Sequence, residues 1–562
     1  MRYSLFLLPL IWISTALLSP VAAQSGYTFS GSLVQAAMLS PDQMAQLSEH
    51  QHLSTARSMA MAGAFASLGG DLASLAINPA GLAMYSTNEF SITPLVTASK
   101  SINSAAAYRS NSASRFSLAN VGMSYKLYEG TGRVVSLNMA VGYNRLADLN
   151  YNTSFKSASP YDGNTPSPSI LRLMAGQLTV NDLYPDSTGF LGYYGERAPD
   201  LWGAMMAYNS YLINPMSDDM GPYWEADRLG DNASVGHYYD LRSRGSIGEY
   251  SLALALNIDN KLYLGLTLGV QDISQRIDLY YGEEYGYGGR AAVNSRGQEL
   301  IEQVEYMHYN QVADLNGVGF SFKLGAIYRP IRPLRIGVAI HIPTIYSVEH
   351  EYAGQMAALC YNNDTQEQIP SDLDSNGSWK DMGGDAWRFS TPTRLMFGLS
   401  YLLGERAVIS VDYERDWYNG IRTKNTPFWI PDAKYYFASK MKDRFVATNN
   451  LRVGVEFKPV QRLALRAGFA WSDSPIRKAE VLDSAPMAER RLTYTAGVGF
   501  RLTPRWAIDA AYQYASSQSA PYRLFSSTYT PTEGPVELLE ASPRYSTELI
   551  RHQMALTLSY RF

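Results

Sequence analysis

The chain ends with His552-Gln-Met-Ala-Leu-Thr-Leu-Ser-Tyr-Arg-Phe562, in which large apolar side chains alternate with polar or small ones. Successive side chains of a β-strand point to opposite faces, so this alternation gives the segment two different surfaces. One surface carries Met554, Leu556, Leu558, Tyr560 and Phe562, and the other carries Ala555, Thr557, Ser559 and Arg561. We therefore predict a strand that faces lipid on one side and a polar interior on the other.

Residues 1–23 predict export of the chain. Arg2 gives a positive start, residues 5–18 form an apolar core, and Pro20-Val-Ala-Ala23 is a small-residue cleavage site. These are the parts of a secretory signal peptide, which is removed and takes no part in the fold. No later run of about 18 apolar residues follows, so we predict no transmembrane helix. Because only helices and closed barrels satisfy backbone hydrogen bonds in hydrocarbon, the chain is predicted to be a membrane barrel; a secreted β-sandwich is the alternative.

Alternating segments of strand length recur along the rest of the chain. Each is at least as long as the roughly 9–11 residues that a tilted strand needs to cross a membrane. The fourteen candidates are residues 88–98, 113–127, 133–153, 240–258, 261–280, 317–329, 334–350, 388–403, 406–420, 448–458, 462–474, 490–503, 505–519 and 545–562.

The connections between these segments alternate between short and long. Outer-membrane barrels have short periplasmic turns and longer extracellular loops, whereas a sandwich gives no reason for this rhythm. We therefore predict an all-β fold, a 14-stranded antiparallel transmembrane β-barrel over residues 87–562. Long loops are expected at residues 281–316 and 351–387, and the largest extracellular loop at residues 154–239.

Residues 24–86 precede the first predicted strand and contain many apolar side chains, including Met59, Met61, Leu68 and Leu72. A segment this apolar does not stay solvated. We predict that it folds into the lumen as an N-terminal plug, or hatch.

Composition and motifs exclude several classes of function. The net charge of −4 offers no basic field for nucleic acid, and the single Cys360 excludes an intramolecular disulfide framework. Aromatic residues make up 12% of the chain, which suits the interfacial girdles of a barrel. The seven His are scattered, and neither a nucleophile elbow nor an HExxH motif is present. We predict no enzymatic activity and no cofactor.

Within residues 24–86 lies Ala56-Arg-Ser-Met-Ala-Met-Ala-Gly-Ala-Phe-Ala-Ser-Leu-Gly-Gly-Asp-Leu-Ala-Ser-Leu-Ala-Ile-Asn-Pro-Ala-Gly-Leu82. This stretch resembles the N-terminal hatch of the FadL/TodX family of outer-membrane transporters for hydrophobic compounds. The residues that carry the resemblance are Gly63, Phe65, Asp71, Asn78, Pro79 and Ala80. Asn78-Pro79 also reads as a plain turn, because proline disfavours a helical preceding residue. The resemblance implies a fourteen-stranded barrel whose hatch shifts when ligand binds.

A helical pattern lies inside the largest loop. Leu201, Met205, Tyr208 and Leu212 recur at the spacing of one face of an amphipathic helix. The resemblance implies that such loop helices offer hydrophobic molecules a first binding groove. The alternative is that the helices only pack on each other.

Cations on the predicted inner face are candidates for a substrate head group. Lys323, Arg335 and Arg466 are the three that we single out, since a cation of this kind can hold a carboxylate. The alternative is that they pair with acidic side chains across the lumen or with the plug.

One polar stretch matches the opening of a calcium-binding loop. Asp372, Asp374 and Asn376 have the spacing of its first ligands, but Gly383 stands where the bidentate Glu belongs. A polar turn is the alternative, and we predict no other metal site.

The resemblance implies passive outer-membrane transport of hydrophobic molecules, with long-chain fatty acids as the family's best-known substrate. The expected partners are such molecules, outer-membrane lipid and lipopolysaccharide, and the barrel-assembly machinery that reads a C-terminal aromatic residue. Localisation in the outer membrane of a Gram-negative bacterium follows. A scaffold or secretion-associated barrel of the same family, without a role in uptake, is the alternative function.

Overall fold

The computed structural model describes residues 26–30, 33, 39–104, 107–109, 111–185, 201–218, 221–372, 383–425, 433–477, 488–531 and 537–562. The predicted signal peptide, residues 1–23, lies outside the described residues, as do Asp374 and Asn376 of the calcium candidate. Among the described residues, no helix is both long and apolar enough to cross a membrane.

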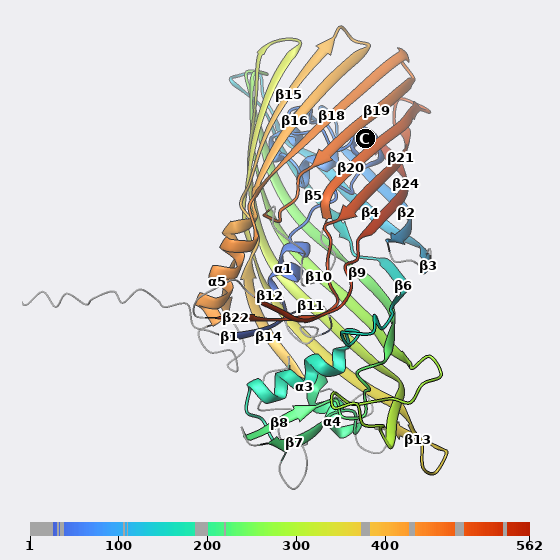
Figure 1. Cartoon of the computed structure of the whole chain (residues 1–562). Coiled ribbons are helices and arrows are strands. Elements are labelled where there is room, and N and C mark those ends of the chain that lie inside the picture. The colour runs from blue at the N-terminus through green and yellow to red at the C-terminus, as the bar shows by residue number, and fades with distance from the viewer. Residues whose placement is uncertain are drawn as a thin grey trace, which may run out of the picture.

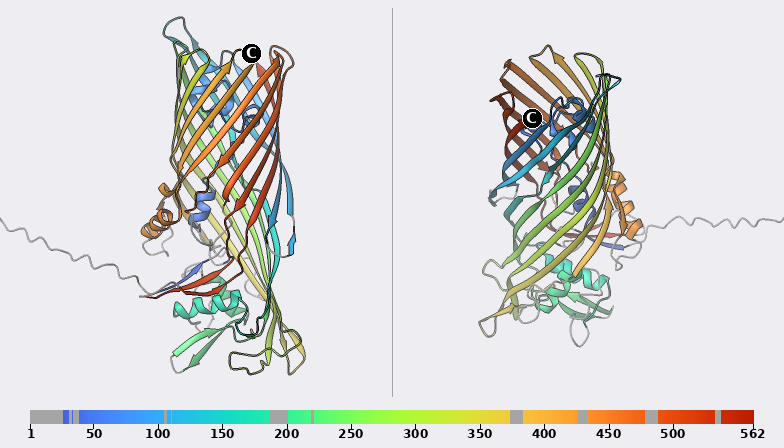
Figure 2. Two further views of the ribbon diagram at one scale, coloured as in Figure 1. Left: turned by 45° about the horizontal axis from the view of Figure 1, so that its top comes forward. Right: turned by 180° about the vertical axis from the view of Figure 1, so that it is seen from behind.

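Antiparallel strands close into a single barrel, with β24 pairing back onto β2 (Figures 1 and 2). The fourteen strands of its wall, as predicted, are β2 (Glu89–Asn103), β4 (Asn111–Glu129), β5 (Val134–Asp148), β9 (Ser234–Ile258), β10 (Leu262–Gly286), β11 (Glu302–Ile331), β12 (Leu334–Asn362), β15 (Arg394–Leu403), β16 (Ala407–Trp417), β18 (Ala447–Val460), β19 (Leu463–Ser472), β20 (Ala488–Arg501), β21 (Trp506–Ser519) and β24 (Thr547–Arg561). Shorter strands extend the wall at the end with the long loops: β3 (Ala107–Arg109), β6 (Tyr151–Ser159), β13 (Glu367–Asp372), β14 (Gly383–Ser390) and β17 (Arg422–Asn425).

The central strands are longer than the sequence pattern predicts. β9 to β12 contain 25, 25, 30 and 29 residues, far more than a membrane requires. The predicted loops at 281–316 and 351–387 are therefore wrong in extent, since β10, β11 and β12 fill much of both. In these outer parts the apolar side chains, such as Tyr281, Met307 and Met356, face inward and join the core of the cap, so the outward apolar face that marks a membrane strand is missing.

The alternation in the terminal strand is confirmed. Met554 and Leu556 are exposed on the outside of the barrel, whereas Gln553 and Thr557 are buried on the inside. The same outward apolar face continues around the wall, for example in Ile336, Val338, Ile340 and Ile342 of β12. The barrel thus has an apolar outer belt and a polar lumen.

The N-terminal segment enters from the loop end and runs inside the barrel toward the opposite end, where Figure 1 shows it in blue. β1 (Gly26–Ser30) pairs with β22 (Ser526–Thr530), and β22 pairs with β23 (Glu537–Ala541). The chain continues through α1 (Pro41–Gln46), α2 (Ala56–Ala60) and two 3-10 helices, η1 (Leu72–Leu75) and η2 (Pro79–Met84), before it reaches β2. Its apolar side chains pack against inner-face residues of the wall.

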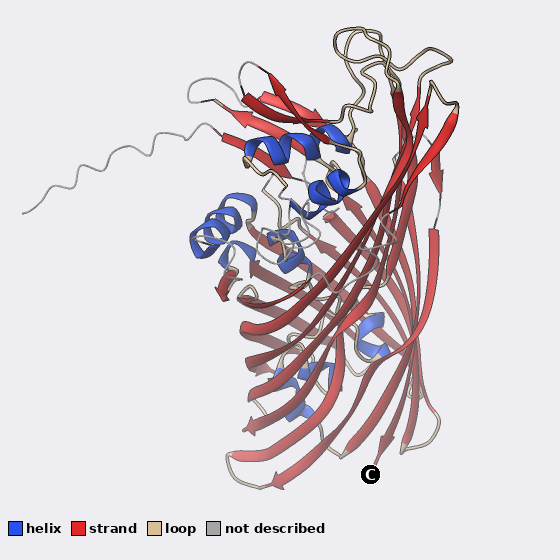
Figure 3. Cartoon of the chain, turned by 90° about the horizontal axis from the view of Figure 1, so that it is seen from below, coloured by secondary structure: helices blue, strands red, loops and turns tan. Residues whose placement is uncertain are grey.

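The long loops form a cap over one end of the barrel (Figures 1 and 3). Residues 160–233 contribute α3 (Ile170–Val180), α4 (Trp202–Asn209), β7 (Asn214–Asp218) and β8 (Gly221–Glu225). A further helix, α5 (Ala433–Arg444), lies at the rim, where Arg444 forms two hydrogen bonds of 2.5 and 2.8 Å to Asp42 of α1. Cys360 is buried in β12, where it belongs to the apolar core of the cap.

Candidate functional site

The Asn-Pro-Ala turn is fixed between the N-terminal segment and the wall. The Asn78 side chain donates to the carbonyl oxygen of Ala66 at 2.5 Å and accepts from the Ala80 amide at 3.1 Å. Pro79 then begins η2, with Asn78 as its N-cap. Asn78 packs so closely on β11 that a Cβ at Gly325 would lie 1.9 Å from its Oδ1 atom. The turn therefore packs directly against the barrel wall, and it is more than a plain connection between two segments.

The other hatch residues also make structural contacts. The Asp71 carboxylate accepts from the Thr55 hydroxyl at 2.6 Å and from the Ala73 amide at 2.9 Å. Gly63 has a positive φ of 75°, and Phe65 is fully buried. The sequence motif thus marks the residues that fold this segment and hold it in the lumen.

The three cations predicted for a head group lie on separate strands, and each has a protein partner. Lys323 pairs with Glu249, and Arg466 bonds to Glu456 at 2.7 Å and to Asp509 at 2.6 Å. Arg335 donates to the backbone oxygen of Leu68 at 2.7 Å. The structure does not bring the three together, and Lys323 and Arg466 have the carboxylates that a substrate would otherwise supply.

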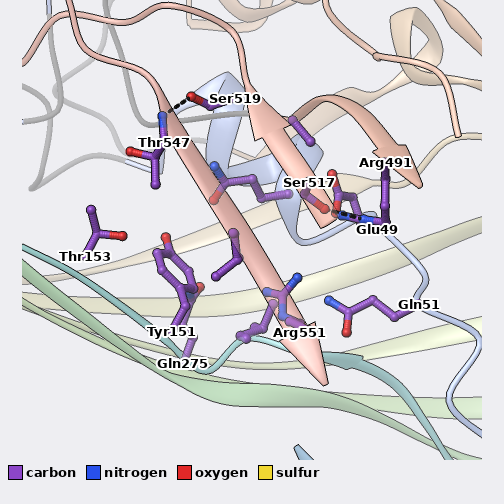
Figure 4. A pocket seen from close by; sticks show the side chains of 14 residues that line it. Glu49, Gln51, Tyr151, Thr153, Gln275, Arg491, Ser517, Ser519, Thr547 and Arg551 are labelled. Carbon is purple, nitrogen blue, oxygen red and sulfur yellow. Dashed lines mark hydrogen bonds and ion pairs between the residues drawn. The ribbon is translucent and has the colours of Figure 1, made fainter. Parts of the chain in front are cut away.

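A different arginine lacks such a partner. Arg551 of β24 is 7% exposed, and its Nε atom has no hydrogen-bond acceptor. No carboxylate among the described residues forms an ion pair with it, and Figure 4 shows no dashed line to it. Nearby, Arg491 of β20 donates to Glu49 at 2.6 Å and to the Ser517 hydroxyl at 3.0 Å. A buried guanidinium without an anion is costly, so this one marks a place where an anion can bind.

Arg551 and Arg491 line a lumen cavity beside the N-terminal segment (Figure 4). Its volume is about 90 Å³. The lining residues are Gln46, Glu49, Gln51, Leu149, Tyr151, Thr153, Gln275, Ala488, Arg491, Ser517, Ser519, Thr547, Leu549 and Arg551. Two cations therefore share the cavity with apolar carbon from leucine and tyrosine. We call this cavity the Arg551 pocket.

Next to the Arg551 pocket the barrel wall is interrupted. The ladder between β4 and β5 ends where Asn120 faces Asn144, two residues beyond the Gly122–Gly142 pair. Beyond this point, β4 pairs only with β2, while β5 and β6 pair with β9. Further out, β3 pairs with β6 and so limits the opening. We call this interruption the wall gap.

The N-terminal segment supplies the hydrogen bonds that the missing strand would make. The backbone N–H of Gln51 donates to Leu146 at 2.8 Å. The Gln51 side chain donates to the Asp148 oxygen and accepts from the Asp148 amide, both at 3.1 Å. The Ser54 hydroxyl donates to the Asn144 side chain at 2.7 Å. Residues 51–54 thus seal the free edge of β5 from inside.

An apolar groove lies on the outer surface beside the wall gap. It offers about 1640 Å³ of open space, and most of its lining side chains are apolar. They include Phe90, Val121, Val141, Tyr250, Leu252, Leu268 and Phe320. A hydrophobic molecule that passed through the gap would meet this surface.

Residues 231–562 match the model of a protein family described as outer membrane protein transport protein (OMPP1/FadL/TodX). The chain belongs to this family. Membership and barrel fold together place this FadL/TodX protein in the outer membrane of Gram-negative bacteria, among channels for hydrophobic compounds, which are transporters and not enzymes.

Solved structures resemble this FadL/TodX protein in fold. A Pseudomonas aeruginosa FadL homologue has a TM-score of 0.50 and 12% identity, with 91% of this chain and 98% of that chain covered. The Pseudomonas putida toluene transporter TodX has a TM-score of 0.48 and 14% identity, with 92% and 99% covered. The CymD monoaromatic hydrocarbon channel has a TM-score of 0.44 and 11% identity, with 92% and 98% covered. No curated protein sequence matches the chain.

In this FadL/TodX protein, the helix in the largest loop is shorter than the apolar spacing from Leu201 to Leu212 predicts. α4 spans Trp202–Asn209, so Leu201 precedes it and Leu212 lies beyond it. The helix ends because Tyr211 has a positive φ of 56°, which a helix cannot continue. Met205 and Leu212 are fully buried, and Tyr208 packs edge-on against Trp224 with 5.3 Å between ring centroids. These residues form the core of the cap, and their role as a substrate groove stays a prediction.

Two carboxylates meet the first turn of α3 in the cap. The Ser169 amide donates to Glu540 at 2.6 Å, and the Ile170 amide donates to Glu283 at 2.8 Å. Glu540 belongs to β23, outside the membrane-spanning strands. Burial raises its pKa to about 7, although the Arg172 charge and the Ser169 bond act in the opposite direction. No group of three metal-ligating side chains occurs among the described residues.

Proposed function

We propose that this FadL/TodX protein transports hydrophobic molecules that carry an anionic head group, with long-chain fatty acids as the substrate. The observation that carries the proposal is the buried, unpartnered Arg551 in a lumen cavity. A carboxylate would satisfy the guanidinium with charge-assisted hydrogen bonds, and the alkyl chain would contact the apolar lining. A neutral hydrocarbon has no acceptor group and would leave the Arg551 guanidinium without a hydrogen-bond partner.

The proposed path is passive. A molecule would be collected at the cap and would place its head group near Arg551. It would then leave through the wall gap toward the outer groove, once residues 51–54 have moved from β5. Because the backbone ladder between β4 and β5 already ends at Asn120 and Asn144, this exit breaks no backbone pairing between the two strands. The bond of 3.3 Å from Arg145 of β5 to the Leu118 oxygen of β4 is a side-chain contact that it must pass. Binding and diffusion are sufficient, and no cofactor is required.

Uptake by cells tests this function. We would delete the gene, restore it as wild type, Arg551→Gln or Arg551→Lys, and measure uptake of radiolabelled oleate and toluene. Wild type and the Lys variant should restore oleate uptake, whereas the Gln variant should lower it by about tenfold, the loss expected for one charged hydrogen bond. Oleate and toluene uptake that is the same with and without the gene would contradict transport and favour the scaffold alternative.

A further inference from the structure

Glu49 and Gln51 connect the Arg551 pocket to the wall gap. Glu49 lines the pocket and pairs with Arg491, whereas Gln51 lines the same pocket and bonds to Leu146 and Asp148 of β5. Only one residue separates them in sequence. A fully extended chain of two residues spans at most about 7 Å, so a displacement of the backbone at Glu49 is transmitted to Gln51.

Glu49 occupies the position in which a substrate head group would be most favourable. Its carboxylate is held 2.6 Å from Arg491, inside the cavity that also contains Arg551. Glu49 and Arg491 also line a second, small cavity of about 40 Å³, whose lining includes Arg394, Glu414 and Asp416. The ion pair therefore stands between an apolar compartment and a charged one.

The segment that carries both residues is anchored at its two ends, and between them Arg394 donates to the Ser48 oxygen and His52 lies 3.8 Å from Glu414. Before it, Asp42 of α1 is bonded to Arg444 at the rim. After it, Thr55 is bonded to Asp71 within the lumen. Residues 47–54 form a strap between these anchors, and the bonds of Glu49, Gln51 and Ser54 hold the strap to the wall.

We propose that Glu49 is a built-in competitor for the substrate head group, and that its displacement from Arg491 withdraws Gln51 from β5 and opens the wall gap. This inference rests on the proposed function, because it requires an anionic substrate. The carboxylate of the substrate first binds Arg551 and then replaces that of Glu49 on Arg491. Arg491 exchanges one carboxylate for another and so keeps an anionic partner, whereas the carboxylate of Glu49 is released.

The exchange also explains how substrate choice and opening are coupled. A ligand shifts a conformational equilibrium only by its differential affinity for the two states. An anionic ligand gains Arg491 in the open state, whereas a neutral hydrocarbon gains no such contact. Opening is therefore reserved for molecules with an anionic head.

The affinity of the full chain for oleate tests the competition. In dodecyl maltoside, Glu49→Gln should bind oleate about tenfold more tightly than wild type, because one charged competitor is removed. Asp473→Asn, which removes a carboxylate from the second cavity only, is the matched control and should leave the affinity unchanged. Equal oleate affinity in Glu49→Gln and wild type would overturn the inference.

A cross-link reports the opening directly. Ser54→Cys and Asn144→Cys, in a Cys360→Ser background, place two thiols across the seal, and a short bis-maleimide joins them. Oleate should slow the cross-link severalfold, whereas hexadecane should not change it. If oleate binds wild type but leaves the cross-linking rate unchanged, the inference fails and the proposed function stands. If oleate does not bind wild type at all, the proposed function fails and the inference fails with it.

Discussion

On the β16–β19 side of the lumen, buried carboxylates meet more than one cation. Glu414 lies 2.7 Å from Arg452 and 3.8 Å from Arg394, and Glu456 lies 2.7 Å from Arg466. On β24, Arg551 meets no carboxylate among the described residues.

The wall itself differs in the same way. The β16–β18 and β18–β19 ladders run across the membrane, whereas the β4–β5 ladder stops at Asn120 and Asn144. The paired side holds the N-terminal segment in place, for example through the bond of 2.7 Å from the Ala66 amide to Asp412. The unpaired side has groups whose partners must come from a ligand or from the strap. The difference supports our proposal that the paired side anchors the hatch and that the substrate passes along the other side.

The largest effect is expected from breaking the paired side. Glu414→Gln would leave Arg452 and Arg394 buried without their carboxylate. Removal of one partner of a buried ion pair costs about 3–5 kcal/mol, so the free energy of unfolding should fall by that amount. Urea titration, followed by the heat-dependent mobility of the folded barrel in gels, measures it. Glu349→Gln, on the exposed outer surface, is the control and should change stability little.

A smaller effect is expected at the seal. Gln51→Ala removes the side chain that satisfies both the N–H and the C=O of Asp148. We expect a loss of about 1–2 kcal/mol and faster hydrogen exchange at the Asp148 amide. Gln46→Ala, which lines the same pocket, should not change that exchange. Equal protection of Asp148 in wild type and Gln51→Ala would mean that the strap does not seal β5.

The smallest effect is expected in the cap, where Glu540 is partly buried beside the α3 N-terminus and forms no ion pair among the described residues. We call the β22–β23 hairpin the flap. Burial raises the pKa of Glu540 from 4.5 to about 7, so the Glu540 carboxyl group holds its proton more tightly when the flap is docked on α3 than when it is undocked. The docking is therefore strongest below about pH 4.5 and weakens as the pH rises through about 7. Limited proteolysis of the flap should become faster over this window in wild type, and Glu540→Gln should remove the dependence. The opposite trend, with docking strongest at high pH, would contradict the account.

The sequence was sufficient for the barrel because strand alternation is a local signal. Each residue of the terminal strand follows the pattern of its neighbours, and the strand count follows by repetition along the chain. The long outer parts of β10 to β12 lack this signal, because there the apolar side chains face inward to the core of the cap and polar ones such as Glu349 and Glu351 face outward. The end of α4 at Tyr211 was missed because the apolar spacing continues to Leu212.

The site was less accessible from sequence, because it depends on partners and not on residue types. Lys323 and Arg466 look like head-group ligands until the fold brings Glu249 and Glu456 beside them. Arg551 stands one residue before the terminal stretch, on the same inner face as Gln553, so its direction was predictable. The lack of a carboxylate partner for Arg551 was not predictable, because only the folded barrel determines which acidic side chains lie beside it. The bonds of Gln51 to the backbone of β5 have no sequence signature at all.

The binding of oleate to Arg551→Gln tests the central claim most directly. In the purified full chain, oleate affinity should fall about tenfold to a hundredfold relative to wild type, the range expected when a charged hydrogen bond is lost. Hexadecane binding and the free energy of unfolding should not fall, because no described residue forms an ion pair with Arg551. Oleate affinity equal to that of wild type would contradict the claim that the Arg551 pocket receives the head group.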